Sequence, residues 1–170
     1  MNAKELTSLE VLSIAIRSEI DAQNVYRELA ERVSNTTAKE RFHILVAEEQ
    51  QHQKLLERKY KEYFPDVHLK LPPSLLPANA KTSTLRKALS LQEVLKLAIQ
   101  AERESRDIYL GAAAKVEDLG GKAMLQFLAD WEYTHQMMLT AEYEMLLKHP
   151  NYFDEAKPWR AEEGLRKKKS

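Results

Sequence analysis

A glutamate and a histidine three residues apart, Glu49 and His52, stand in the stretch EEQQHQ. On a helix this spacing places the two side chains on adjacent turns of one face. Both fall on the apolar stripe of their segment, where an uncompensated ionised carboxylate costs several kcal/mol. A carboxylate and an imidazole on one face are suitable ligands for a divalent transition metal. A single Glu-x-x-His pair is weak evidence, because most such pairs lie on a solvated helix face.

The pair recurs 83 residues later as Glu132 and His135. Other residues repeat with the same shift, including two glutamates, two tyrosines and two capping boxes. The pairs are Glu19 with Glu102, Tyr26 with Tyr109, Leu45 with Leu128, Thr7 with Ser90, and Glu10 with Glu93. The chain therefore contains two copies of one helical hairpin in the same register.

Four segments have the helical periodicity needed to position these residues. They span residues 8–33, 38–63, 90–116 and 122–148. Short breaks separate the members of each hairpin, and Gly120-Gly121 marks the second break. The connection at 64–89 is rich in proline and has no sustained period. This connectivity predicts an all-α four-helix bundle in which hairpins 8–63 and 90–148 are joined by a long crossover.

The length of 170 residues suits one domain with a substantial core, assigned here to residues 1–150. Residues 151–170 form a C-terminal tail that contains Trp159 and is compatible with a short fifth helix.

The repeated glutamates lie at the centres of the apolar stripes. Tyr26 falls within about 40° of Glu19 on a helical wheel, and Tyr109 has the same relation to Glu102. Two divalent cations would neutralise the charge of four inward carboxylates, and imidazole with hard oxygen ligands favours iron or manganese. The candidate metal ligands are Glu19, Glu49, His52, Glu102, Glu132 and His135.

Several other polar residues do not share this pattern. Glu48, whose repeat partner is Trp131, falls about 100° from the stripe and is not expected to be a ligand. Gln23 and Arg106 occupy equivalent positions near the ligands and are candidates to orient carboxylates. Residues expected at the surface or in turns are His43, His68, His149, Glu28, Glu104 and Glu144.

Composition excludes several function classes. The chain has no cysteine, so it holds no disulfide, thiol nucleophile, iron–sulfur cluster or rubredoxin-type iron site. Its formal net charge of zero gives no general attraction to nucleic acid or anionic membranes. The N-terminal sequence MNAKELTSLEVLS lacks the apolar core of a signal peptide, and no apolar run is long enough to span a membrane. We therefore expect a cytoplasmic protein that binds neither nucleic acid nor membrane.

The ligand set resembles the di-iron site of the ferritin-like superfamily. The stretches AIRSEIDAQNVYREL and AIQAERESRDIYL are most similar to its rubrerythrin branch, and the similarity covers roughly residues 8–148. The resemblance implies a ferritin-like bundle with two non-haem iron ions, for which manganese or zinc can substitute. It also implies reduction of hydrogen peroxide or oxygen in oxidative-stress defence. Glu49 and Glu132 would bridge the metals, and Tyr26 and Tyr109 would hydrogen-bond the site or scavenge oxidising equivalents.

The sequence departs from the family pattern in its electron supply and ligand count. Without cysteine, a peroxidase would need a separate electron-donor protein of the rubredoxin-like kind. Many rubrerythrins carry a further carboxylate three residues after the third-helix glutamate, where this chain has Ser105. The six-ligand set is similar to the ferroxidase site of bacterioferritin. Gln50 stands where bacterioferritin has its haem-ligating methionine, so no haem is expected.

Four functions stay open at this point. The first is a di-iron peroxidase, and the second is a ferroxidase that handles iron. The third is oxygenation of an organic substrate, which would need an apolar access pocket. The fourth is an interaction bundle with a structural metal. A homodimer is expected because the bundle leaves its outer helical faces available.

Overall fold

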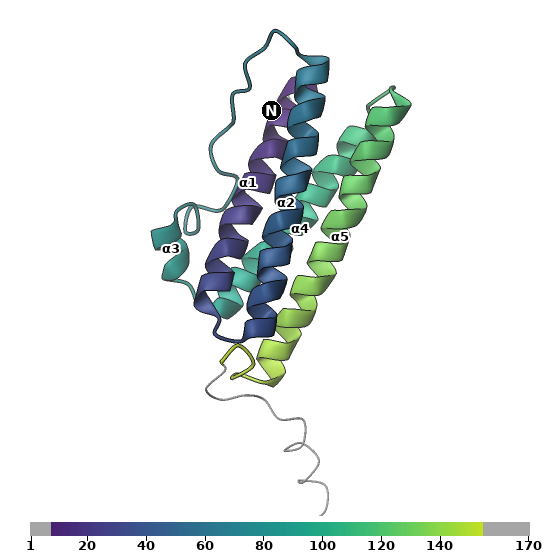
Figure 1. Cartoon of the computed structure of the whole chain (residues 1–170). Helices are drawn as coiled ribbons and strands as arrows, with labels where there is room; N and C mark the ends of the chain where they lie inside the picture. Colours follow the sequence, from purple (N-terminus) through teal and green to yellow (C-terminus); the bar gives the residue numbers. More distant parts are fainter. Residues whose placement is uncertain (1–7, 155–170) are drawn as a thin grey trace, which may run out of the picture.

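The computed structural model describes residues 8–154, and this part of the chain contains five helices. They are α1 (Ser8–Arg32), α2 (Thr36–Tyr63), α3 (Ser83–Lys87), α4 (Leu91–Ala113) and α5 (Leu119–Lys148). The four long helices form a bundle, which confirms the predicted all-α architecture (Figure 1). None of the described helices combines the length and apolar character needed to cross a membrane.

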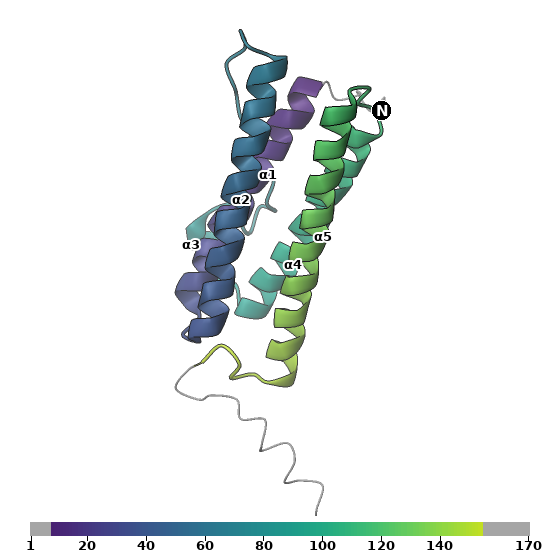
Figure 2. The same cartoon turned by 45° about the vertical axis from the view of Figure 1, so that its right-hand side comes forward.

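The bundle is built from two antiparallel hairpins that lie side by side (Figure 2). Helices α1 and α2 form one hairpin, α4 and α5 form the other, and α1 also packs against α4. The crossover runs from the end of α2 along the outside of α1 to the start of α4 at the opposite end of the bundle (Figure 1). This long return makes α2 and α4 parallel, and it leaves the repeat partners α1 and α4 packed against each other in opposite directions (Figure 1).

Side-chain caps set several helix ends. The predicted capping box at the start of α4 is confirmed, because Ser90 and Glu93 each accept the other's backbone N–H. The last helix begins earlier than predicted, since the Asp118 carboxylate accepts the N–H of Gly121 at 2.7 Å. Gly120-Gly121 therefore lies in the first turn of α5 and not in the connection. Thr7, Trp159 and the suggested C-terminal helix lie outside the described residues.

The apolar core is divided into two clusters, one toward each end of the bundle. The first contains Leu29, Phe42, Leu95 and Leu139, and the second contains Ile16, Leu56, Tyr109 and Leu128. In every long helix, the candidate metal ligands fall between the residues of these two clusters. The apolar clusters therefore enclose a polar layer at mid-length.

The crossover is held to α1 by buried polar contacts. Helix α3 was not predicted, and its Arg86 is buried, lies 3.1 Å from a carboxylate oxygen of Glu28 and donates to the carbonyl of Ala80. The prediction that Glu28 is solvated was wrong, because this residue is only 3% exposed. Arg32 lies 3.9 Å from Glu28 and donates to the carbonyl of Leu89. These contacts fix the second half of the crossover on the bundle.

Replacing Arg86 with alanine should lower the free energy of unfolding by about 2–3 kcal/mol, because Glu28 would keep only the more distant Arg32. The double variant Glu28→Met with Arg86→Met should recover most of this loss, since it buries no charge. Urea unfolding of the metal-free protein, followed by circular dichroism, measures both. The exposed neighbour Lys87, changed to alanine, is the control. A loss as small for Arg86→Ala as for Lys87→Ala would contradict the proposed role of the buried pair.

Candidate metal centre

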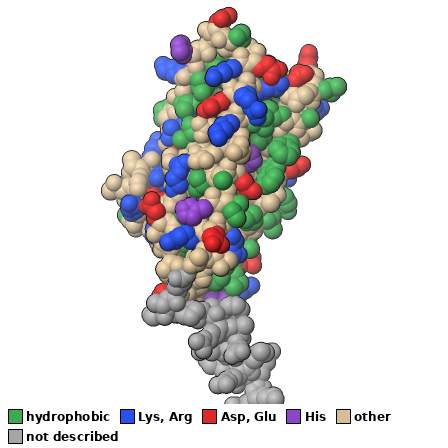
Figure 3. Space-filling view, viewed as in Figure 1, with side chains coloured by type: hydrophobic (Ala, Val, Ile, Leu, Met, Phe, Trp, Pro, Cys, Tyr) green, Lys and Arg blue, Asp and Glu red, His purple; other side chains and the backbone are tan. Residues whose placement is uncertain are grey.

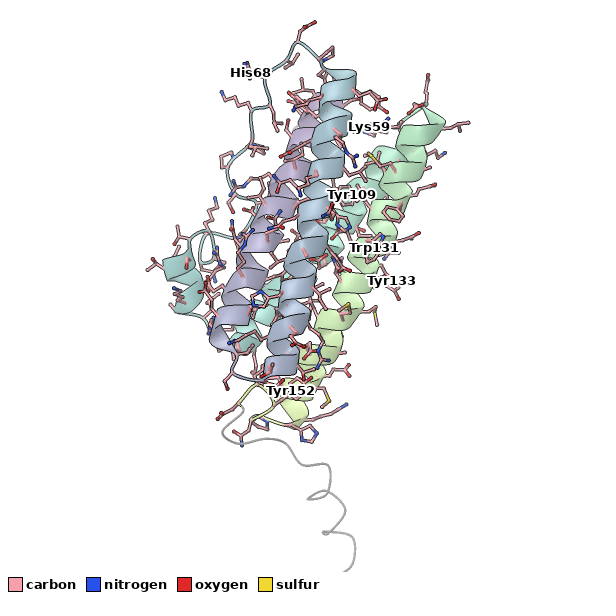
Figure 4. All side chains as sticks on the ribbon, in the orientation of Figure 1. Lys59, His68, Tyr109, Trp131, Tyr133 and Tyr152 are labelled. Carbon is pink, nitrogen blue, oxygen red and sulfur yellow. The ribbon has the colours of Figure 1, made fainter. Side chains whose placement is uncertain are left out.

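The six predicted ligands meet in the polar layer of the bundle. Helices α1 and α4 each contribute one glutamate, and α2 and α5 each contribute one Glu-x-x-His pair. None of the six residues is more than 5% exposed. Figure 4 shows Tyr109 and Trp131, which flank this layer, near mid-length of the bundle. The helical repeat thus places every candidate ligand at the same height in the core.

The described residues contain two overlapping groups that could each hold a metal ion. In each group, the potential ligand atoms lie within 4.8 Å of one another. One group is Glu19, Glu49, His52 and Glu132; the other is Glu49, Glu102, Glu132 and His135. Each group therefore has one imidazole, one carboxylate of its own and two carboxylates that it shares with the other group.

Glu49 spans the two groups with its two oxygen atoms. Its Oε2 lies 3.0 Å from Nδ1 of His52, and its Oε1 lies 2.7 Å from Nδ1 of His135. The two imidazole rings are stacked with their centroids 5.6 Å apart. A carboxylate in this position is suited to bridge two metal ions that each take one imidazole nitrogen.

Two buried tyrosines hold the unshared carboxylates. The hydroxyl of Tyr26 donates to Oε1 of Glu102, and the hydroxyl of Tyr109 donates to Oε1 of Glu19. Each tyrosine belongs to the hairpin opposite the glutamate that it contacts, and the two pairs are related by the sequence repeat. These hydrogen bonds orient Glu19 and Glu102 and leave the second oxygen of each available to a metal. A direct role of either tyrosine in catalysis stays a prediction.

The surroundings of the two histidines break the symmetry. Oε2 of Glu48 lies 3.1 Å from Nε2 of His135, an arrangement that orients the ring and raises the basicity of its other nitrogen. The residue equivalent to Glu48 is Trp131, which has no carboxylate and whose ring centroid lies 5.9 Å from that of His52 and 6.0 Å from that of His135. Glu48 is not a ligand in either group, as expected, but its contact with His135 was missed. The wheel angle of Glu48 on its own helix gave no signal, because the contact depends on the neighbouring α5.

The remaining polar residues lie apart from the ligand carboxylates. Gln23 donates to Gln53 at 2.7 Å and to the backbone carbonyl of Glu49 at 3.5 Å. The guanidinium of Arg106 lies over the ring of Tyr133 at 4.8 Å. Neither residue orients a ligand carboxylate as suggested. The metal-binding groups found in the described part of the chain include none of His43, His68 and His149.

The carboxylates raise the pKa of both buried imidazoles. Burial by itself would lower these values, but Glu19 and Glu49 raise the pKa of His52 to about 9. Glu102 and Glu49 have the same effect on His135, whose pKa rises to about 12. In the metal-free protein at neutral pH, both imidazoles therefore carry a proton.

The carboxylates respond in opposite directions. Burial and the nearby charge of Glu49 raise the pKa of Glu19 well above its usual range. Burial, with repulsion from the other carboxylates, does the same for Glu132. For Glu49 burial also opposes ionisation, but the imidazoles of His135 and His52 outweigh it and lower the pKa. Without metal, protons on the imidazoles and on some carboxylates limit the charge of the layer.

The residues fit a metal pair because several of their polar atoms converge without hydrogen-bond partners. Within residues 8–154, such buried atoms include Glu102 Oε2 and Glu132 Oε1, and Glu49 Oε1 and His135 Nδ1 have only their 2.7 Å contact with each other. Orphaned polar atoms of this kind are costly in a core unless a ligand or ion satisfies them. All four belong to the group that contains His135. Hard oxygens and imidazole nitrogen without sulfur suit iron or manganese.

A family model for rubrerythrin matches residues 10–143. The chain belongs to the rubrerythrin family. Its fold is also similar to the solved structure of a hypothetical protein from Pyrococcus furiosus, with 30% sequence identity and a TM-score of 0.73. This similarity covers 86% of the present chain and 94% of the other. No curated protein matches the chain. Membership implies a di-iron carboxylate protein, and the buried glutamates and histidines of this rubrerythrin are suitable to form such a centre.

Removal of a shared carboxylate should affect both metals of this rubrerythrin, whereas removal of one imidazole should affect one. After anaerobic ferrous loading and desalting, we expect about two metals per chain in the unmodified protein and about one in His52→Ala. Glu49→Gln should retain almost none, because Glu49 belongs to both groups. Elemental analysis gives the ratios, with His68→Ala as the control. Equal loss in His52→Ala and Glu49→Gln would rule out the shared arrangement.

Metal binding should release protons, because a ligating imidazole must be neutral. With pKa values of about 9 and about 12, His52 and His135 are both protonated in the metal-free protein at pH 7. Metal loading at pH 7 should therefore release about two protons from the two histidines. The apparent affinity of the protein for metal should rise between pH 6 and pH 9. Calorimetric titration in buffers of different ionisation enthalpy measures the release. Affinity that is constant over this pH interval would contradict the protonated state of the histidines.

Proposed function

We propose that this rubrerythrin is a non-haem di-iron oxidoreductase that reduces hydrogen peroxide in oxidative-stress defence. The observation that carries the proposal is the pair of adjacent metal-binding groups that share Glu49 and Glu132. Reduction of the O–O bond needs two electrons, and two bound ferrous ions would supply them together. Burial of the layer between two apolar clusters keeps bulk water away from this chemistry.

The protein residues have distinct roles in this proposal. His52 and His135 each serve one metal, and Glu48 holds the ring of His135 in place. Tyr26 and Tyr109 hold a phenolic proton at Oε1 of the carboxylates that they contact, and this would orient Glu102 and Glu19 toward bound metals. These contacts support a site that is organised before its substrate arrives.

The proposal includes partners for electron supply and assembly. The chain has no cysteine, so reducing equivalents would come from a separate rubredoxin-like donor protein. A homodimer is also proposed. Exposed apolar side chains on α5 support it, among them Phe127, Tyr133 and Met137, and Figure 3 shows hydrophobic side chains gathered on that side of the molecule. Such a surface is suited to contact with another protein chain.

Ferroxidase activity is the second candidate, and the surroundings of Ser105 favour it. The hydroxyl of Ser105 lies 2.5 Å from that of Ser18 and brings no seventh carboxylate to the centre. The resulting set of six ligands is similar to that of the bacterioferritin ferroxidase site. In that function, iron itself would be the substrate and oxygen or peroxide the oxidant.

The oxidant preference distinguishes the two candidates. The ferrous-loaded protein is prepared without oxygen and is then mixed rapidly with either hydrogen peroxide or oxygen at equal concentration. Hydrogen peroxide should oxidise the iron at least about tenfold faster, a difference of about 1.4 kcal/mol in activation free energy. His52→Ala, with one metal site impaired, is the control and should lose the rapid phase. Faster oxidation by oxygen, with repeated turnover of added ferrous iron, would favour the ferroxidase instead.

A further inference from the structure

A cavity of about 580 Å³ lies between α1 and α4, beneath the middle of the crossover at residues 75–79. Its lining includes Glu102, which also belongs to one of the two metal-binding groups. The volume lies within the range of small-molecule sites in proteins. The cavity therefore lies directly beside one candidate metal ligand and has room for a molecule larger than peroxide or oxygen.

Small side chains on the two facing helices leave room for this cavity. Ser18 and Ala22 line it from α1, and Ala101 and Ser105 line it from α4. The 83-residue shift relates Ser18 to Ala101 and Ala22 to Ser105. The cavity therefore opens where the two hairpins meet, one helical turn or less from Glu102 on α4.

The outer wall of the cavity is held in position by Asp21. Its Oδ2 accepts the hydroxyl of Ser74 at 2.9 Å and the N–H of Leu75 at 2.7 Å, and its Oδ1 pairs with Arg17. Leu75 and the following Leu76 both line the cavity. The wall is thus an anchored part of the crossover, so the cavity is a formed site in this structure.

The lining selects the chemistry of an occupant. Most of the wall area is apolar, and leucine, isoleucine and alanine side chains contribute to it, which suits an apolar body. The paired hydroxyls of Ser18 and Ser105, beside Glu102, offer hydrogen bonds to a polar end. The carboxylates in the lining disfavour an anion, and its single cation, Lys96, is exposed and lies over the ring of Tyr143. These features favour a neutral molecule with one polar end.

We propose that the cavity binds neutral organic hydroperoxides, with the apolar group against the leucines and the –OOH end at Ser18 and Ser105. This inference rests on the proposed peroxide reduction and names a wider substrate class for it. The O–O bond of ROOH would be broken with two electrons and two protons to give ROH and water. The electrons would come from two ferrous ions that become ferric, and the donor protein would later restore them.

Binding can be tested apart from turnover with cumyl alcohol, the redox-inert product of cumene hydroperoxide. In zinc-loaded, diamagnetic protein, the alcohol should shift the amide NMR signals of Ala22 and Ala101. Ala22→Phe, which fills the cavity, should weaken binding at least about tenfold. Ala101→Leu is a milder second variant, and Ala141→Phe places the same bulk on the exposed face of α5 as the matched control. The metal content of each variant checks that the centre is intact.

Rapid mixing of the ferrous protein then compares cumene hydroperoxide with hydrogen peroxide. We expect both to oxidise the iron, and the ratio of their rates to fall at least about tenfold in Ala22→Phe but not in Ala141→Phe. Oxidation by hydrogen peroxide alone, without alcohol binding, would overturn the wider substrate class and leave the proposed function standing. Oxidation by neither peroxide would overturn both. Alcohol binding that is unchanged in both cavity variants would place the ligand elsewhere and overturn the assignment of this cavity.

Discussion

The burial of four carboxylates in one layer of an apolar core is the constraint on which the rest of this structure depends. Each carboxylate would be strongly destabilising alone, because desolvation and mutual repulsion both oppose its charge. The surrounding structure compensates for them with two imidazoles, two tyrosine hydroxyls and a geometry that suits two cations. Apolar clusters on both sides exclude solvent, so the charge of the carboxylates must be balanced by groups inside the layer. The fold therefore specifies the centre, and the centre in turn limits which residues the middle of each helix can carry.

The crossover is also held by buried charged side chains, and it forms one wall of the cavity beside Glu102. Its return along α1 is stabilised by Arg86 with Glu28 at one point and by Asp21 at another. Buried pairs of this kind add little net stability but penalise alternative positions of the segment, since each would leave a charge unpaired. Because the crossover passes over the seam between α1 and α4, its position also determines the outer wall of the cavity beside Glu102.

Periodicity predicts the long helices, because it is a property of each helix by itself. The internal repeat predicts that the six candidate ligands converge, because it places them at equivalent positions on four helices in a fixed register. Contacts between elements were harder to infer. Glu48 meets His135 only because α2 and α5 are neighbours, and Arg86 reaches Glu28 from a segment without any period. The start of α5 was misplaced because one side chain, Asp118, caps a turn that contains two glycines. The cavity depends on how far apart two helices pack, which no pattern within one helix encodes.

The different surroundings of the two histidines have a consequence for the history of the fold. One hairpin carries three of the six ligands, and two identical hairpins related by a two-fold axis would present the same pair of metal-binding groups. In such a symmetric assembly, any substitution would appear on both sides at once. Joining the copies in a single chain removes that restriction, so Glu48 can contact one imidazole while the equivalent position in the other hairpin holds Trp131. A single covalent chain thus allows two chemically distinct metal positions within a scaffold that is built as a repeat.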